Sequence, residues 1–186
     1  MGHWPIGNYM NNLKPITLRK VKSQASYLLK ELKNNSTNSI AAANRFLQIP
    51  PFSNKISSWI IDHADSVQLK HAYHVIAVET GFTAWTALKH AIIENDCLYK
   101  STCVGFVHAW FSDYAKAEIY FNRHGGYLIC FWKDFVVCGK EYICGIGLSQ
   151  YEEQWKSIGY NWVRPGDSKA FHFLKEAAAK NYLAQQ

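Results

Sequence analysis

Two side chains in the second half of the chain, Cys103 and His124, are the best candidates for catalysis. A thiolate that is activated by a neighbouring imidazole can attack a substrate, and the imidazole then protonates the leaving group. His108 is closer to Cys103 in the sequence, but a spacing of five places the two on opposite faces of a regular strand. The pair Cys103 and His124 therefore indicates a Cys/His-dependent hydrolase or transferase. In the alternative interpretation all five cysteines are core residues, because free cysteines in apolar runs are usually buried.

A second set of candidates is His71 and His74, which lie three residues apart and therefore on adjacent turns of a predicted helix. Together with His63 or Asp62 they offer ligands for a metal ion. A zinc site, however, needs three or four ligands within tetrahedral reach, and neither this set nor the cysteine spacing matches a common zinc motif. We therefore expect no metal and no other cofactor.

The segment from Tyr160 to Pro165 concentrates polar groups among large aromatic rings in a predicted loop. Rings that line a concave surface form a pocket, in which Arg164 would pair with a carboxylate or phosphate and Asn161 would orient the ligand. Binding functions also concentrate on loops. The alternative is that these rings fill the core. The candidate ligand-binding residues are Trp132, Tyr160, Asn161, Trp162 and Arg164.

The positive charge is concentrated at the start of the chain. Residues 1–55 carry eight basic side chains and one acidic one, whereas the rest has 12 basic and 13 acidic ones, so the net charge of +6 arises in the first third. A localised basic region attracts acidic proteins, phosphates or anionic lipid headgroups, although it can also be an ordinary solvated helix face. The candidate partner-binding residues are Arg19, Lys20, Lys22, Lys30 and Lys33.

The composition is that of a folded globular protein: 48% of the 186 residues are hydrophobic, 15% aromatic and 18% charged. These values exclude a disordered or fibrous chain. No apolar run approaches the roughly 20 residues that a membrane span needs. Residues 1–10 lack a signal-peptide pattern, and the odd number of five cysteines argues against a disulfide framework. We therefore expect a cytoplasmic protein without a transmembrane segment.

The first half of the chain is predicted to be helical. Thr17 is placed to cap a helix that runs to about Asn34, because apolar residues repeat there every three to four positions. Ser39 is placed to cap a short helix that stops before Pro50-Pro51.

A third helix, from Asp65 or Ser66 to Gly81, and a fourth, which Thr83 is placed to cap, form a tight pair. Their spacing is typical of a DNA-binding helix-turn-helix, so nucleic-acid binding through residues 66–94 is an alternative function. The fourth helix carries one lysine and no arginine, which favours an ordinary pair of helices instead.

The second half alternates between strands and helices. Lys133-Asp134 is the expected hairpin turn, and Ser149 and Glu152 form an expected capping box. The expected strands are 102–111, 127–132 and 135–138, and the expected helices are 113–124 with Ser112 as cap, a short piece to 146, a short helix to 157, and 167–183. The fold class is therefore α+β: a basic helical module, residues 1–95, packed on a small, mostly antiparallel sheet with flanking helices, residues 96–186.

The residues that carry a family resemblance are Leu18-Arg19-Lys20-Val21-Lys22, Ala42-Ala43-Asn44-Arg45-Phe46, Leu69-Lys70-His71-Ala72, Ile76-Ala77, Gly81-Phe82, Trp85 and Ala87-Leu88-Lys89. Through them, residues 15–94 resemble a helical module that in bacterial proteins precedes ankyrin repeats or a glyoxalase-related domain. Neither follows here, and the module brings no catalytic residue. The second half, with Gly125-Gly126-Tyr127-Leu128 and residues 158–165, resembles small uncharacterised bacterial proteins. The resemblance implies a bacterial context and no activity.

Together these observations favour a bacterial, cytoplasmic binding or regulatory protein of unknown function. Its basic N-terminal helix would bind an acidic partner, and its aromatic and arginine loop would bind a ligand or peptide. In the alternative, the protein binds nucleic acid through the helix pair at residues 66–94. Enzymatic activity stays open, with Cys103 and His124 as its candidates.

Overall fold

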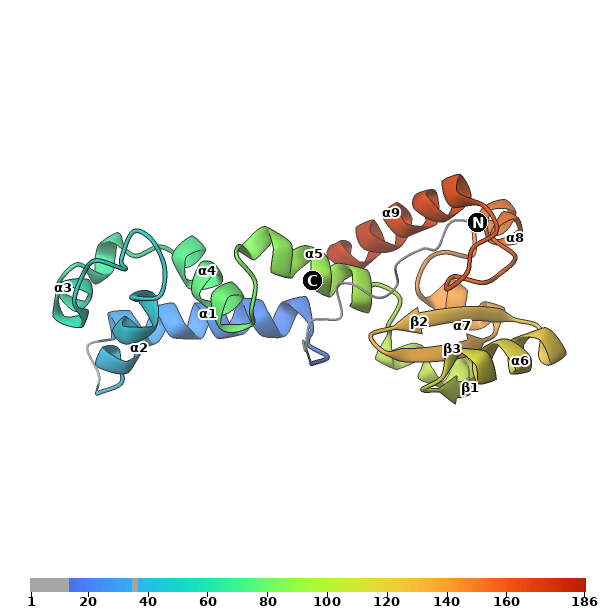
Figure 1. The fold of residues 1–186 in the computed structure, drawn as a ribbon, viewed down its shortest axis with the longest axis horizontal. Helices are drawn as coiled ribbons and strands as arrows, with labels where there is room; N and C mark the ends of the chain where they lie inside the picture. The colour runs from blue at the N-terminus through green and yellow to red at the C-terminus, as the bar shows by residue number, and fades with distance from the viewer. Residues whose placement is uncertain (1–13, 35–36) are drawn as a thin grey trace. The chain divides into compact units, whose positions relative to one another are not determined.

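The computed structural model describes residues 14–34 and 37–186 of the chain (Figure 1). The fold is α+β, as the sequence predicts, and the described residues contain one three-stranded antiparallel sheet. The chain divides into two compact units after Ile92, within helix α5 (Trp85–Asp96), three residues before the division that the sequence predicts, after residue 95. We refer to the two parts as the N-terminal unit and the C-terminal unit. No helix in the described part of the chain is long and apolar enough to cross a membrane.

Helix α1 (Leu18–Lys33) begins after its predicted cap, Thr17, whose hydroxyl accepts a hydrogen bond from the Lys20 N–H at 3.2 Å. Its apolar stripe packs against α4 (Leu69–Glu79) and α2 (Ser39–Phe46). The fully buried residues of the stripe are Leu18, Val21, Ala25, Leu28 and Leu32. Both the helix and its buried side are therefore confirmed.

Helices α4 and α5 start later than predicted, whereas α2 starts one residue earlier, at Ser39. Helix α4 begins at Leu69 because Gln68 is its cap residue: the Gln68 carbonyl accepts the His71 N–H at 2.9 Å, and His71 Nδ1 accepts the Gln68 N–H at 3.1 Å. The predicted start at residues 65–66 is instead a 3-10 helix, η1 (Ala64–Ser66). A further helix, α3 (Ser57–Asp62), is not predicted by the sequence pattern.

Two predicted caps are displaced by one residue. Asn38 rather than Ser39 precedes α2, and Ala84 rather than Thr83 precedes α5. Gly81, by contrast, follows α4 with a φ of +88°, the left-handed conformation that ends helices, as predicted.

The sheet of the C-terminal unit contains β1 (Val107–Phe111), β2 (Tyr127–Phe131) and β3 (Asp134–Cys138) in the order β1-β3-β2. The predicted strand at residues 102–111 is only half strand, because Ser101–Phe106 forms a 3-10 helix, η2. Val107 pairs with the last residue of β3, so the residues before it have no strand to pair with. A β-branched and aromatic composition cannot form a strand without that partner.

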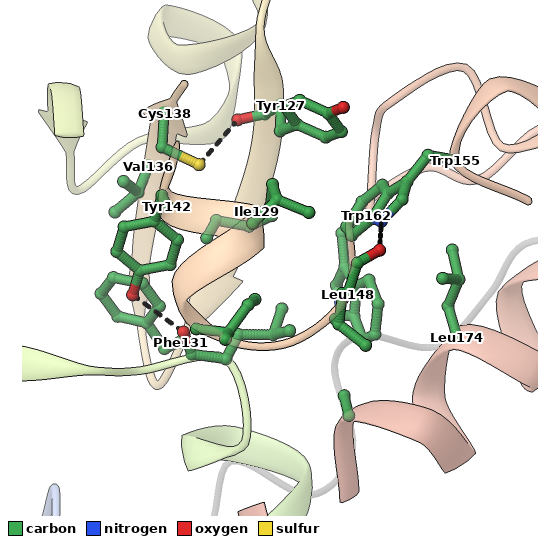
Figure 2. Close-up of a cluster of buried hydrophobic side chains, with 14 of the residues drawn as sticks. Tyr127, Ile129, Phe131, Val136, Cys138, Tyr142, Leu148, Trp155, Trp162 and Leu174 are labelled. Carbon is green, nitrogen blue, oxygen red and sulfur yellow. Dashed lines mark hydrogen bonds between the residues drawn. The ribbon is translucent and has the colours of Figure 1, made fainter. Parts of the chain in front are cut away.

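The two faces of the sheet enter separate clusters of buried side chains. On one face, Tyr127, Ile129 and Val136 belong to the main core (Figure 2). On the other face, Leu128 and Val137 pack with α6. The helices around the sheet are α6 (Tyr114–His124), α7 (Lys140–Gly145), α8 (Glu152–Ser157) and α9 (Ser168–Ala184), and the last three contribute to the main core.

Two helix caps in this unit show how local chemistry sets the boundaries. Asp113, and not the predicted Ser112, caps α6 by accepting the Lys116 N–H at 3.0 Å. Asp167 caps α9 as predicted, because its carboxylate accepts the Ala170 N–H at 2.8 Å.

Candidate functional site

Helix α1 carries all five predicted partner-binding residues: Lys22 is half-buried, and Arg19, Lys20, Lys30 and Lys33 are exposed. At 100° per residue, Arg19, Lys22, Lys30 and Lys33 fall within about 80° of one another around the helix, over an axial length of about 21 Å. Lys20 lies at least about 80° outside this stripe. We define Arg19, Lys22, Lys30 and Lys33 as the basic face.

The lysines of this helix are not neutralised by the described residues. Neither Lys20 nor any lysine of the basic face makes an ion pair or a side-chain hydrogen bond with them. Helix α1 contains one acidic residue, Glu31, and its carboxylate accepts a hydrogen bond from the Asn38 amide at 3.1 Å. Arg45 differs, because it forms a two-fold ion pair with Glu79, at 2.8 and 2.7 Å.

The two units differ in charge. The N-terminal unit has ten basic and four acidic side chains, whereas the C-terminal unit has ten of each. The whole net charge of +6 therefore belongs to the N-terminal unit, and the lysines of α1 supply a large share of it.

The predicted ligand loop at residues 160–164 is packed onto the sheet. The Leu128 N–H donates to the Tyr160 carbonyl at 2.9 Å, and the Leu128 carbonyl accepts the Trp162 N–H at 2.8 Å. The Trp162 ring is only 6% exposed and contacts Trp155 and Phe171, with ring centroids 5.7 and 5.0 Å away. Trp162 therefore fills the core, as the alternative interpretation proposed.

The polar groups of the loop are engaged within the protein. Asn161 Oδ1 accepts the N–H groups of Val163 and Arg164, at 3.0 and 2.9 Å, and its amide donates to the Tyr114 hydroxyl at 3.1 Å. The Arg164 guanidinium lies over the Tyr114 ring, 4.4 Å from its centroid, and 3.6 Å from the Glu118 carboxylate. Burial and the hydrogen bond to Glu118 raise the pKa of Tyr114. These bonds hold the loop and engage the Asn161 amide within the protein, whereas the Arg164 side chain stays 65% exposed.

Glu152 has a different partner from the one that the capping-box pattern predicts. Helix α8 follows Tyr151 and has no side-chain cap, so Ser149 and Glu152 form no capping box. The Glu152 carboxylate instead accepts the hydroxyls of Tyr160 and Tyr127, at 2.8 and 3.2 Å.

Trp132 lies apart from the other predicted ligand-binding residues. It follows β2, about 13 Å along the strand from Leu128, which holds the loop. The hairpin turn is Trp132-Lys133 and not the predicted Lys133-Asp134, because Phe131 already pairs with Asp134. Trp132 has a φ of +54°, and its backbone N–H donates to Asn95 at 2.9 Å. The five predicted residues therefore do not converge on one pocket.

The candidate catalytic pair is also separated. Cys103 lies in η2, is 5% exposed and belongs to the main core. His124 is exposed at the end of α6, with its ring stacked on Tyr120 at 4.3 Å. Because α6 packs on the opposite face of the sheet from the main core, the structure does not bring the thiol and the imidazole together. His108 lies in β1 and Cys103 in η2, so the prediction that the two residues share one strand is wrong.

Burial governs the chemistry of three other cysteines. It raises the pKa of Cys97 and Cys138 to about 12 and that of Cys130 to about 11, so these thiols stay protonated near neutral pH. Cys144 is exposed.

The histidines of α4 have structural contacts. His71 caps its own helix, and His74 Nε2 lies 3.2 Å from the Thr83 carbonyl. His63 stacks on Trp59, with ring centroids 4.1 Å apart. Within residues 14–34 and 37–186, no group of three or more His, Cys, Asp or Glu side chains is placed to hold a metal ion.

The predicted helix pair exists, with Trp85 of α5 stacked on Tyr73 of α4 at 4.4 Å. This contact engages one of the side chains that a recognition helix would need to expose. Lys89 is the only basic residue of α5 other than His90, and the helix also carries Glu94 and Asp96. The charge of α5 gives little support to phosphate contacts.

The sequence does not predict the groove that the structure shows in the N-terminal unit. A groove of about 630 Å³ opens beside α1, between residues 14–16 with Lys20 and Gln24 on one side and residues 79–81 on the other. A sequence pattern cannot predict that two segments about 60 positions apart lie side by side. The helical repeat of α1 does show that Lys20 and Gln24 lie on a different side of the helix from the basic face.

Comparison with known proteins identifies no relative: no family model, no curated protein and no solved structure matches this chain.

Proposed function

We propose that this protein is a binding or regulatory protein that captures an acidic protein on the basic face of α1. The supporting observation is that the lysines of this helix lack acidic partners among the described residues. The apolar side of the same helix is fully buried along its length, so the helix is held in place by the fold. Positive charge that the fold does not neutralise attracts and orients a negatively charged partner.

The burial of the apolar stripe bears on the kind of partner. An amphipathic helix that lies in a membrane surface inserts its apolar side among the lipids. In α1 the apolar side, from Leu18 to Leu32, is buried against α4 and α2, so only the charged side is accessible to a partner. This arrangement supports a macromolecular partner rather than a lipid surface. That the partner is bound in the cytoplasm of a bacterium is part of the proposal and comes from the sequence alone. The loop at residues 160–164 has no part in the proposal, because Trp162 is buried.

The test measures binding of fluorescein-labelled poly-L-glutamate to the full chain by fluorescence anisotropy. One variant neutralises the basic face: Arg19→Gln, Lys22→Gln, Lys30→Gln and Lys33→Gln. Its matched control removes the same charge from exposed lysines of the C-terminal unit: Lys116→Gln, Lys133→Gln, Lys156→Gln and Lys169→Gln. We expect the first variant to bind at least about tenfold more weakly and the control to bind like the wild type, with affinity that falls as salt is added.

Equal losses in the two variants would show that only net charge matters, and would overturn the proposal. A labelled DNA duplex provides the second arm. If it binds the same face more tightly than poly-L-glutamate at equal salt, the partner is a nucleic acid and the assignment to an acidic protein is wrong.

A further inference from the structure

The groove beside α1 adjoins the proposed binding helix but uses different residues. One wall is formed by residues 14–16 with Lys20 and Gln24, and the other by residues 79–81 at the end of α4. Its volume of about 630 Å³ is in the range of sites that hold small ligands or short peptide segments.

The groove has an excess of positive charge. Lys14 and Lys20 are exposed, and neither makes an ion pair or a side-chain hydrogen bond with any residue that the structure describes. Glu79 is the acidic residue of the lining, and Arg45 already neutralises it through both carboxylate oxygens. Lys14 and Lys20 therefore line the groove without a compensating charge among the residues that the structure describes.

The remaining lining suits an extended peptide. Pro15 and half-buried Ile16 give an apolar surface, and the Gln24 amide offers both a donor and an acceptor to a peptide backbone. Gly81 has a φ of +88°, and an added Cβ would meet nothing within 4 Å, so the wall is bare backbone beside open space at this one position.

We infer that this groove holds an extended acidic segment of the protein that the basic face captures, with carboxylates on Lys14 and Lys20 and an apolar side chain on Ile16. The inference rests on the proposed function, and it adds a site that distinguishes peptides by the order of their side chains as well as by their charge. A smooth basic helix selects only for negative charge, whereas a groove with alternating charged and apolar lining selects a sequence.

The test uses the full chain and a fluorescein-labelled synthetic pentapeptide of alternating glutamate and leucine. Gln24→Trp fills the groove without a change in charge. Gln48→Trp makes the same substitution at an exposed position that does not line the groove. We expect Gln24→Trp to weaken peptide binding by about tenfold or more and Gln48→Trp to leave it unchanged. Lys14→Gln and Lys20→Gln should each weaken it by up to about fivefold.

The outcomes separate this inference from the proposed function. If poly-L-glutamate binding depends on the basic face but the pentapeptide binds Gln24→Trp as well as wild type, the groove assignment is wrong and the proposed function stands. If neither probe binds the wild-type chain, both are wrong. If inorganic phosphate displaces the peptide when sodium chloride of equal ionic strength does not, the groove is a small-anion site and the peptide assignment is overturned.

Discussion

Trp132 donates its indole N–H to Oδ1 of Asp96 at 2.9 Å, although the two residues are 36 positions apart. The other carboxylate oxygen accepts the Tyr182 hydroxyl at 2.6 Å. Asp96 is only 3% exposed, so this carboxylate links the end of α5, the turn between β2 and β3, and α9 from a buried position.

Replacing this carboxylate should be costly. We expect Asp96→Ala to lower the free energy of unfolding by about 2–4 kcal/mol, because the buried Tyr182 hydroxyl and the half-buried Trp132 indole then lose their acceptor. Tyr182→Phe removes one donor and should cost about 1 kcal/mol. Urea denaturation followed by tryptophan fluorescence measures both values. Equal stability of Asp96→Ala and the wild type would contradict this role for the carboxylate.

The cysteines should react in an order set by burial. We expect a thiol reagent such as iodoacetamide to modify Cys144 first, because it is the cysteine classed as exposed. Cys97, Cys130 and Cys138 should react much more slowly than Cys144, since burial raises the pKa of each, and Cys138, which is fully buried, should be the slowest of the three. Mass spectrometry of the native chain over time gives the order, and Cys144→Ser should remove the fast phase. Rapid modification of Cys103 in the native state would revive the thiol hydrolase hypothesis.

Stability should fall in alkaline solution. Burial, with the nearby Glu152 charge, raises the pKa of Tyr127 from its ordinary 10 to about 12, and burial raises that of Cys138 from 9 to about 12. Because the pKa is higher in the folded state, the unfolded state loses the proton at a lower pH than the folded state does. The contribution of each group to the free energy of unfolding is therefore complete below its ordinary pKa and is lost as pH rises to about 12. Urea midpoints measured from about pH 8 to pH 11 should therefore decrease, and Tyr127→Phe should flatten the decrease above pH 10. An unchanged slope in Tyr127→Phe would assign the effect to other groups.

The sequence pattern predicted those features that depend on neighbouring residues. The helical repeat of α1 and its Thr17 cap are local, and both are present in the structure. The acceptors of Trp132 and the packing of Trp162 depend on residues far along the chain, so neither pattern nor composition could distinguish a ring in the core from a ring in a pocket. A tryptophan at positive φ, as Trp132 is, also has no sequence signal.

Candidate sites follow the same division. The basic face could be predicted from the sequence, because the sequence gives the charge of each residue and the helical repeat of α1 gives the side of the helix on which it lies. The separation of Cys103 from His124 could not be predicted from the sequence, because it depends on which face of the sheet each of the two elements covers. The Ser149 and Glu152 pattern failed since the Glu152 carboxylate binds two tyrosine hydroxyls instead.

The turn at Asn161 provides a last prediction. Its Oδ1 satisfies two backbone N–H groups, including that of buried Val163, and its amide donates to Tyr114. Asn161→Ala removes all three bonds and should lower the free energy of unfolding by about 2 kcal/mol. Asn161→Asp keeps the acceptor for the two backbone groups and loses only the bond to Tyr114, so its cost should be about half as large. Urea midpoints at equal denaturant dependence measure the difference, and an aspartate variant less stable than the alanine variant would show that the backbone turn is not the main contribution of Asn161.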